Sequence, residues 1–147
     1  EPPQAADVDA THQALAELIT GVVEADSAAF ASRFQALLAL FRMHVAEEGG
    51  LMRSSRYPGI AEHEGDHHRI LGELVQLNLA IRRGRIALAR AYVKDGLAPW
   101  FDLHLATMDA ALSAHLRRTA YSTVWMPASR MCRSLASWPV LFRKSQL

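Results

Sequence analysis

The sequence contains a single cysteine, Cys132, which excludes a disulfide bond within the chain. A lone cysteine gives no sign of an oxidising compartment, so we expect a cytoplasmic protein. No apolar run approaches the roughly 20 residues of a membrane-spanning helix, so we expect no membrane association. Half of the 147 residues are nonetheless apolar, and a chain of this length predicts one domain with a sizeable hydrophobic core.

Acidic residues and histidines are absent beyond His115, although the formal net charge of the whole chain is only +1. Residues 1–118 carry 12 basic and 15 acidic side chains, which excludes the basic footprint of a nucleic-acid-binding domain. Residues 119–147 carry four basic side chains and no acid. We therefore divide the chain into a domain over residues 1–118 and a basic C-terminal tail over residues 119–147, to which we assign no function.

Strand-like alternation is nowhere sustained, whereas apolar residues recur at helical spacing as far as about residue 118. Helix starts are expected at Asp7 or Asp9 and at Ser27, because these side chains favour the N-cap position. Gly96 and Pro99 are expected to break or kink the last helix. Four helices joined by short connections predict an all-α protein with an up-down-up-down four-helix bundle. The four predicted helices cover residues 9–25, 28–48, 60–83 and 86–118.

Each predicted helix directs one or two histidine or carboxylate side chains into its apolar face. Residues four positions apart differ by about 40° of rotation, so His63 and His67 share one face of the third helix. His44 and Glu48 share one face of the second helix for the same reason. The full set of inward polar residues is His12, His44, Glu48, His63, His67, His104 and Asp109.

One histidine on an apolar face is more often a satisfied core residue than a metal ligand, and a single i,i+4 pair can be a helix-surface contact. Burying all these groups without partners costs several kcal/mol apiece, which a domain stable by about 5–15 kcal/mol cannot sustain. A metal centre removes this conflict, since divalent metals prefer neutral imidazoles and ionised carboxylates. Five imidazoles and two carboxylates exceed the needs of one ion, which favours two ions, iron or manganese, bridged by the carboxylates. His104 and Asp109, about 140° apart on an ideal helix, also suit a binuclear centre better than a single ion.

The segment EHEGDHH, residues 62–68, places three histidines and three acids in seven positions. Helical phase separates them, because His68 is turned about 100° from His67 and points, with Glu62 and Asp66, to the solvated side. Glu64 lies near the boundary and is a candidate to support the site without binding metal. Of this segment we therefore expect only the two histidines four positions apart to be ligands.

These residues resemble the hemerythrin family, and the bacterial hemerythrin-like proteins in particular, over about residues 7–117. The family signature is one histidine on the first helix, HxxxE on the second, HxxxH on the third and HxxxxD on the fourth. Seven ligands in this helical order are far more specific than any single motif. The matching segments are DATHQAL (9–15), HVAEEGGLM (44–52), YPGIAEHEGDH (57–67) and WFDLHLATMD (100–109).

The resemblance implies a non-haem di-iron centre with seven protein ligands. Two carboxylates would bridge the irons beside an oxo or hydroxo group, and O2 would bind reversibly at the iron that has only two histidines. One iron would take His63, His67 and His104, the other His12 and His44, and the bridges would be Glu48 and Asp109. The family's pocket positions suggest an apolar lining for O2 formed by Leu15, Val45, Trp100 and Leu105.

The leading interpretation is an oxygen-binding protein for carriage, storage or sensing rather than an enzyme, although weak oxidase or peroxidase activity is compatible with it. Its partner is O2, with no nucleic acid and no membrane, and the oligomeric state is left open with a monomer favoured. One alternative is a di-iron enzyme acting on O2, peroxide or nitric oxide; another is an iron-storage or metal-binding module of a signalling protein. Ferritin-like oxidases need two ExxH motifs, and only Glu64-x-x-His67 has that spacing here.

Overall fold

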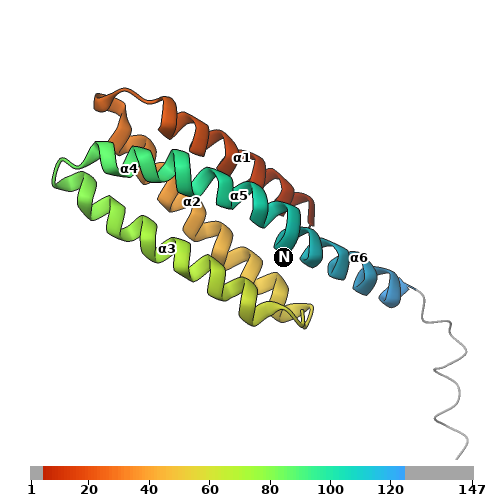
Figure 1. Ribbon diagram of the computed structural model, residues 1–147. Helices are drawn as coiled ribbons and strands as arrows, with labels where there is room; N and C mark the ends of the chain where they lie inside the picture. The colour runs from red at the N-terminus through yellow and green to blue at the C-terminus, as the bar shows by residue number, and fades with distance from the viewer. Residues whose placement is uncertain (1–4, 125–147) are drawn as a thin grey trace, which may run out of the picture.

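The computed structural model describes residues 5–124, in which four helical rods lie side by side (Figure 1). Consecutive rods run in opposite directions, since each short connection turns the chain back, and no strand occurs among these residues. The all-α, up-down-up-down four-helix bundle is thereby confirmed. The first three rods are α1 (Ala5–Glu24), α2 (Ser27–Ser54) and α3 (Ile60–Arg82). The fourth is a continuous series of α4 (Ile86–Tyr92), η1 (Val93–Leu97), α5 (Ala98–His104), η2 (Leu105–Asp109) and α6 (Ala110–Val124).

The predicted N-caps of the first two helices are wrong. Helix α1 begins before both candidate acids, so Asp7 and Asp9 lie within it. Helix α2 is capped by Asp26 rather than Ser27, because Asp26 has an extended backbone and its carboxylate accepts a hydrogen bond from the N–H of Ala29 at 2.8 Å. Both residues are of a type that favours the cap position, and the backbone conformation of the turn decides between them.

The two turns that follow α2 and α3 are tight because a residue with positive φ lies just after each helix. After α2, Arg56 has a φ of 54°, and the N–H of Tyr57 donates to the carbonyl of Met52 at 2.9 Å. After α3, Gly84 has a φ of 80°, which glycine adopts without steric cost. This left-handed residue and the backward hydrogen bond satisfy the last carbonyls of the helix and reverse the chain.

The fourth rod continues through Gly96 and Pro99, contrary to the predicted break. The π-helical turn η1 absorbs this segment: the N–H of Ala98 donates to the carbonyl of Val93, five residues back. Pro99 then falls in the first turn of α5, where a helix tolerates proline. The rod runs on past the predicted end at residue 118 to the end of α6. The remainder of the predicted tail, residues 125–147, lies outside the described residues.

Apolar side chains from all four rods fill one half of the bundle, near the α1–α2 and α3–α4 turns. Leu15 of α1, Phe34 of α2, Leu74 of α3 and Val93 of η1 are fully buried there. Burying a side chain of this size stabilises the fold by roughly 1.5–3 kcal/mol. The other half, near the α2–α3 turn, contains the buried polar side chains instead.

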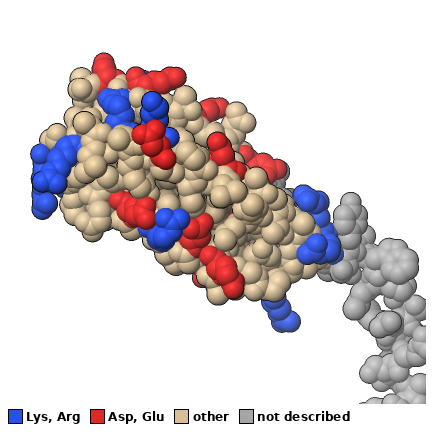
Figure 2. All heavy atoms as spheres, in the orientation of Figure 1, with Lys and Arg blue, Asp and Glu red and all other residues tan. Residues whose placement is uncertain are grey.

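The surface carries charges of both signs, interspersed on the face that Figure 2 shows. Among the residues that the structure describes, no helix is long and apolar enough to cross a membrane. The polar interior, rather than this mixed surface, is therefore where the chain departs from an ordinary helical bundle.

Candidate metal centre

The structure brings together all seven side chains that the sequence predicted as metal ligands. Each is buried, with exposed fractions from 0% for His67 to 8% for His12. They come from all four rods, and their ring nitrogens and carboxylate oxygens form two groups, within each of which these atoms lie within 4.8 Å of one another. The first group is Glu48, His63, His67, His104 and Asp109, and the second is His12, His44 and Glu48.

A second π-helical turn, η2, positions the two residues of the fourth rod. Within it the N–H of Ala110 donates to the carbonyl of Leu105, five residues back. This wider turn brings residues five positions apart onto one face, and His104 Nε2 lies 3.3 Å from Asp109 Oδ1. The angle of about 140° expected for an ideal α-helix does not apply here, because the helix is not ideal at this point.

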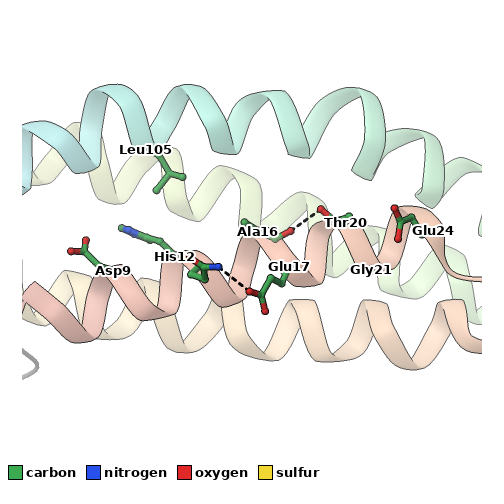
Figure 3. A pocket seen from close by; sticks show the side chains of 9 residues that line it. Asp9, His12, Ala16, Glu17, Thr20, Gly21, Glu24 and Leu105 are labelled. Atoms are coloured by element: carbon green, nitrogen blue, oxygen red, sulfur yellow. Dashed lines mark hydrogen bonds between the residues drawn. The ribbon is translucent and has the colours of Figure 1, made fainter.

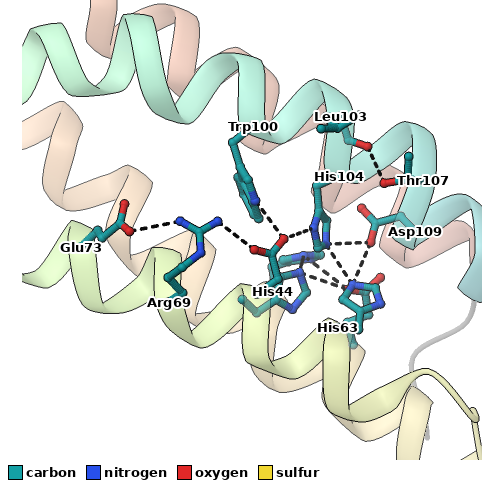
Figure 4. A network of polar contacts seen from close by, with 12 residues as sticks. His44, His63, Arg69, Glu73, Trp100, Leu103, His104, Thr107 and Asp109 are labelled. Atoms are coloured by element: carbon teal, nitrogen blue, oxygen red, sulfur yellow. Dashed lines mark hydrogen bonds and ion pairs between the residues drawn. The ribbon is translucent and has the colours of Figure 1, made fainter.

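The first group centres on His63, which contacts both carboxylates. Its Nε2 lies 3.0 Å from Asp109 Oδ1 and 3.2 Å from Glu48 Oε2. The Nε2 of His104 approaches the Nε2 of His63 at 2.9 Å, and His67 Nε2 lies 3.6 Å from Glu48 Oε2. Figure 4 shows His63, His104 and Asp109 pointing toward one another from α3 and the fourth rod.

The second group adds His12 of α1 and His44 of α2 to the same centre. His12 Nε2 lies 3.3 Å from Asp109 Oδ2 and 3.9 Å from Glu48 Oε1. His44 Nε2 lies 3.5 Å from Glu48 Oε2 and 3.4 Å from His67 Nε2. The two groups are therefore adjacent, and both carboxylates contact histidines of each group.

Most of the converging atoms are buried without a hydrogen-bond partner. These include both oxygens of Glu48, both oxygens of Asp109 and the Nε2 of His12. A buried polar atom left unpaired costs about 1–3 kcal/mol, and more when it is charged. A divalent cation satisfies carboxylate oxygens and imidazole nitrogens at once, so the buried cluster fits a metal site.

Burial and neighbouring charges move the pKa values of these groups away from their usual ranges. Burial lowers the pKa of His44 to about 3 and that of His67 to about 2. Burial also opposes charge on His63, but the carboxylates of Asp109 and Glu48, 3.0 and 3.2 Å from its Nε2, outweigh it and raise the pKa of His63 to about 9. Despite burial, the neighbouring histidines His104 and His63 hold the pKa of Asp109 below its usual range. The neutral imidazoles of His44 and His67 and the ionised Asp109 are thus already in the forms that bind a cation, whereas His63 gives up a proton when a cation binds.

Aromatic rings separate this cluster from the apolar core. The ring of Phe41 lies 6.0 Å from that of His44 and 6.0 Å from that of His67. The Trp100 ring lies 4.7 Å from that of His104, and the Phe101 ring 6.3 Å from that of His12. Phe41 and Phe101 belong to that core and cover the cluster on this side, whereas Trp100 is half-buried and lines a surface pocket together with His104 and Asp66.

The four residues suggested as an O2 lining do not share one environment. Leu15 and Val45 are buried in the core cluster, and Trp100 is half-buried against His104. Leu105 faces α1, where it lines a surface groove of about 720 Å³ together with His12 (Figure 3). The groove reaches the most exposed of the seven predicted ligands, so the cluster is closest to solvent on this side.

The remaining residues of EHEGDHH largely follow the predicted phase. His68 and Glu62 are exposed, whereas Glu64 pairs with Arg53, its Oε1 2.6 Å from the guanidinium. Asp66 is the exception: it was predicted on the solvated side, but its Oδ2 lies 3.0 Å from His104 Nδ1. The sequence missed this contact because the partner lies on another helix.

A four-helix bundle that buries five histidines and two carboxylates at one level is a metal-binding helical bundle. Residues 5–118 match the family model of the hemerythrin HHE cation binding domain. The chain is 31% identical to a protein named Bacteriohemerythrin from Ralstonia nicotianae over 108 residues, which cover 74% of this chain and 78% of the relative. The chain belongs to the hemerythrin family. No solved structure matches it significantly.

Proposed function

We propose that the buried cluster holds two non-haem irons and that the protein binds O2 reversibly there, for carriage, storage or sensing. The observation that carries the proposal is the division of seven buried donor side chains into two adjacent groups that share Glu48, with Asp109 of the first group also contacting His12 of the second. A single zinc ion takes about four ligands, so seven are too many for it. Membership of the hemerythrin family supports non-haem iron, and the donor set of nitrogen and oxygen without thiolate agrees with it.

The positions of the carboxylate oxygens support Asp109 and Glu48 as bridging ligands. Asp109 directs Oδ1 to His63 and His104 and Oδ2 to His12. Glu48 directs Oε1 to His12, and its Oε2 lies nearest to His63 and also contacts His44 and His67. An oxo or hydroxo group would complete the bridge. We assign His63, His67 and His104 to one iron and His12 and His44 to the other.

With fewer histidines, the second iron would keep an open position, which is the requirement for binding an external molecule. When bound, the two irons supply the electrons for the reversible reduction of O2. The protein contributes apolar cover: Phe41, Trp100 and Phe101 each have a ring next to a histidine of the cluster, and Leu15 is fully buried. Excluding water from such a site limits proton leakage and side reactions, which favours release of O2 over irreversible oxidation.

The donor set also supports binding over turnover. Five of the seven donors are imidazoles, so only two of the ligands are anionic. A site with few anionic ligands stabilises high-valent iron less well than a carboxylate-rich site does. Carboxylate-rich di-iron sites of the ferritin-like kind use a glutamate from each of two helices and Glu-x-x-His pairs from the others. Here Glu64 of the lone ExxH spacing pairs with Arg53 instead. A di-iron enzyme, or a metal-binding module that does not react with O2, is therefore the alternative that the experiment must separate.

The test is reconstitution with ferrous iron without oxygen, followed by an iron count per chain and by cycles of O2 and vacuum. We expect two irons per chain and a visible charge-transfer band that appears with O2 and disappears under vacuum over several cycles. Prompt irreversible oxidation, or steady O2 consumption in the presence of a reductant, would replace this proposal with an enzyme. Two irons without any response to O2 would leave only a metal-binding module.

A further inference from the structure

Asp66 is a second carboxylate of α3 that reaches the metal centre without joining the seven donors. It lies between His63 and His67 in sequence, but its side chain contacts Trp100 and His104 of α5. Its Oδ2 accepts a hydrogen bond from Trp100 Nε1 at 2.9 Å and lies 3.0 Å from His104 Nδ1. Its Oδ1 accepts a hydrogen bond from Arg69 at 2.8 Å. One carboxylate thus connects two side chains of α5 to α3.

We propose that Asp66 is a positioning residue that holds the imidazole of His104 with its Nε2 directed at the metal. An ionised carboxylate can only accept hydrogen bonds, so His104 must donate from Nδ1. The proton on Nδ1 leaves the lone pair of Nε2 for a metal ion. The inference rests on the metal-binding part of the proposed function and is independent of O2.

The other two histidines of the first group lack this support. The Nδ1 atoms of His63 and His67 are buried without a hydrogen-bond partner, so packing alone orients their rings. His104 differs because its ring is fixed from both sides: the Trp100 ring lies 4.7 Å away, and the indole N–H binds the same carboxylate oxygen of Asp66. Asp66 therefore controls one particular ligand, at the point where the π-helical turn η2 begins.

Asp66 is itself held in place by a series of polar contacts that runs away from the metal centre (Figure 4). Arg69, which binds Asp66, also donates to Glu73 Oε1 at 3.1 Å. Glu73 in turn accepts a hydrogen bond from the hydroxyl of Tyr92 on α4. This series ties α3 to the fourth rod at two levels and stops the Asp66 carboxylate from turning toward solvent.

The first test uses Co²⁺ as the probe and compares Asp66→Ala with Asp102→Ala. Asp102 is an exposed carboxylate two residues before His104, so its variant removes the same charge near the same ligand without touching the ring. We expect Asp66→Ala to lose Co²⁺ to a chelator about 10- to 100-fold faster than the wild type. The control should lose it at the wild-type rate, and far-UV circular dichroism should show equal helix content.

The second test reads the His104 ring directly. In the Co²⁺-loaded protein, proton NMR should show a strongly shifted imidazole N–H signal that exchanges slowly with water in the wild type. That signal should exchange rapidly or vanish in Asp66→Ala and return in Asp66→Glu, which a purely structural role would not produce. Should Asp66→Ala fail to fold, Asp66→Leu keeps a side chain of similar shape, removes both acceptor oxygens and gives the same comparison.

The outcomes separate this inference from the proposed function. A wild-type chain that takes up no Co²⁺ and no ferrous iron overturns the metal centre itself. A wild-type chain that binds metal, with release rates and N–H exchange in the Asp66 variants equal to those of Asp102→Ala, overturns the positioning role and leaves the metal centre intact.

Discussion

At the scale of single residues, Glu47 and Glu48 show how helical phase separates a predicted ligand from its neighbour. The two are neighbours in sequence, but about 100° of rotation separates them on a helix. Glu48 is 1% exposed with both oxygens unpaired by the protein, whereas Glu47 is half-buried outside the cluster. Two identical side chains therefore lie in different environments, one inside the cluster and one outside it. Substitutions at the two positions can be compared without any difference in the charge or size of the side chain removed.

We predict that Glu48→Gln abolishes the binding of two irons per chain, whereas Glu47→Gln retains it. The substitution at position 48 keeps the volume of the side chain but removes the negative charge and one of the two acceptor oxygens that a bridge requires. His63→Ala and His68→Ala form a second matched pair of the same kind, with the buried histidine as the sensitive position. Iron analysis after anaerobic reconstitution is the measurement. Two irons retained in Glu48→Gln would contradict the assigned ligand set.

Helical phase could predict much of the site, since every inward residue lies on the apolar face of its own helix. It failed for Asp66 because phase describes one helix at a time. On α3 alone Asp66 belongs to the solvated side, and only Trp100 and His104 of α5 give it a partner at the metal centre. Contacts between helices depend on which rods are neighbours and at what level, which one sequence does not specify.

At the scale of helices, the fourth rod differs from the other three because two π-helical turns interrupt it. Its segments α4 and α5 have only seven residues each, and η2 runs from the residue after His104 to Asp109. Hydrophobic spacing could predict that a helix covers this region, but a rotation of 100° per residue was assumed throughout. That assumption makes the i,i+5 spacing of His104 and Asp109 unfavourable for binding one ion. The break or kink was expected separately, from Gly96 and Pro99 as helix breakers. One extra residue in a turn changes both conclusions.

We predict that the fourth rod tolerates deletion of a residue inside η2 better than deletion inside α5. Removing the exposed Ala106 converts the wide turn into an ordinary one, in which His104 and Asp109, then four positions apart, still share a face. Removing the exposed Asp102 instead rotates His104 and all following residues by about 100° relative to α4.

The measurement is again the number of metal ions bound per chain, together with the melting temperature. The chain without Ala106 should bind metal with a melting temperature lowered by a few degrees, corresponding to roughly 1 kcal/mol. The chain without Asp102 should bind no more than one ion or fail to fold. Equal metal binding by both chains would show that η2 does not set the spacing of these ligands.

At the scale of the whole molecule, the buried polar cluster lies between the main apolar core and a second set of buried apolar side chains. The main core includes Val45, Leu15 and Phe101. Beyond the polar cluster, Met52 and Leu112 are also buried but do not belong to that core. Apolar packing is therefore interrupted by seven polar side chains, and a domain of this size is stable by only about 5–15 kcal/mol. Bound metal should accordingly stabilise the fold, because it binds the folded chain and not the unfolded one.

Without metal, the buried histidines should make the free energy of unfolding depend on pH. His44 and His67 have pKa values lowered by burial to about 3 and about 2, whereas in the unfolded chain the pKa of both stays near the ordinary value of 6.5. Between those limits only the unfolded chain takes up the two protons, so unfolding becomes easier as pH falls below 6.5. His63 has the opposite effect at higher pH. Its pKa is raised from 6.5 in the unfolded chain to about 9 in the folded chain, so it stabilises the fold fully below pH 6.5, and this stabilisation is lost as pH rises toward 9.

We therefore predict a stability maximum near pH 6.5 for the metal-free protein. From about pH 6.5 to about pH 5 each of the two buried neutral histidines should remove about 2 kcal/mol from the free energy of unfolding, since one pH unit corresponds to about 1.4 kcal/mol per group. Urea unfolding of the chelated protein at the two pH values measures this difference.

His44→Gln removes one titrating group and should reduce the loss of unfolding free energy by about half. The control His68→Gln, at an exposed position, should leave the loss unchanged. A free energy of unfolding that is equal at the two pH values would mean that these histidines are not held neutral by burial, and that the bundle opens to water at the level of the metal centre when the metal is absent.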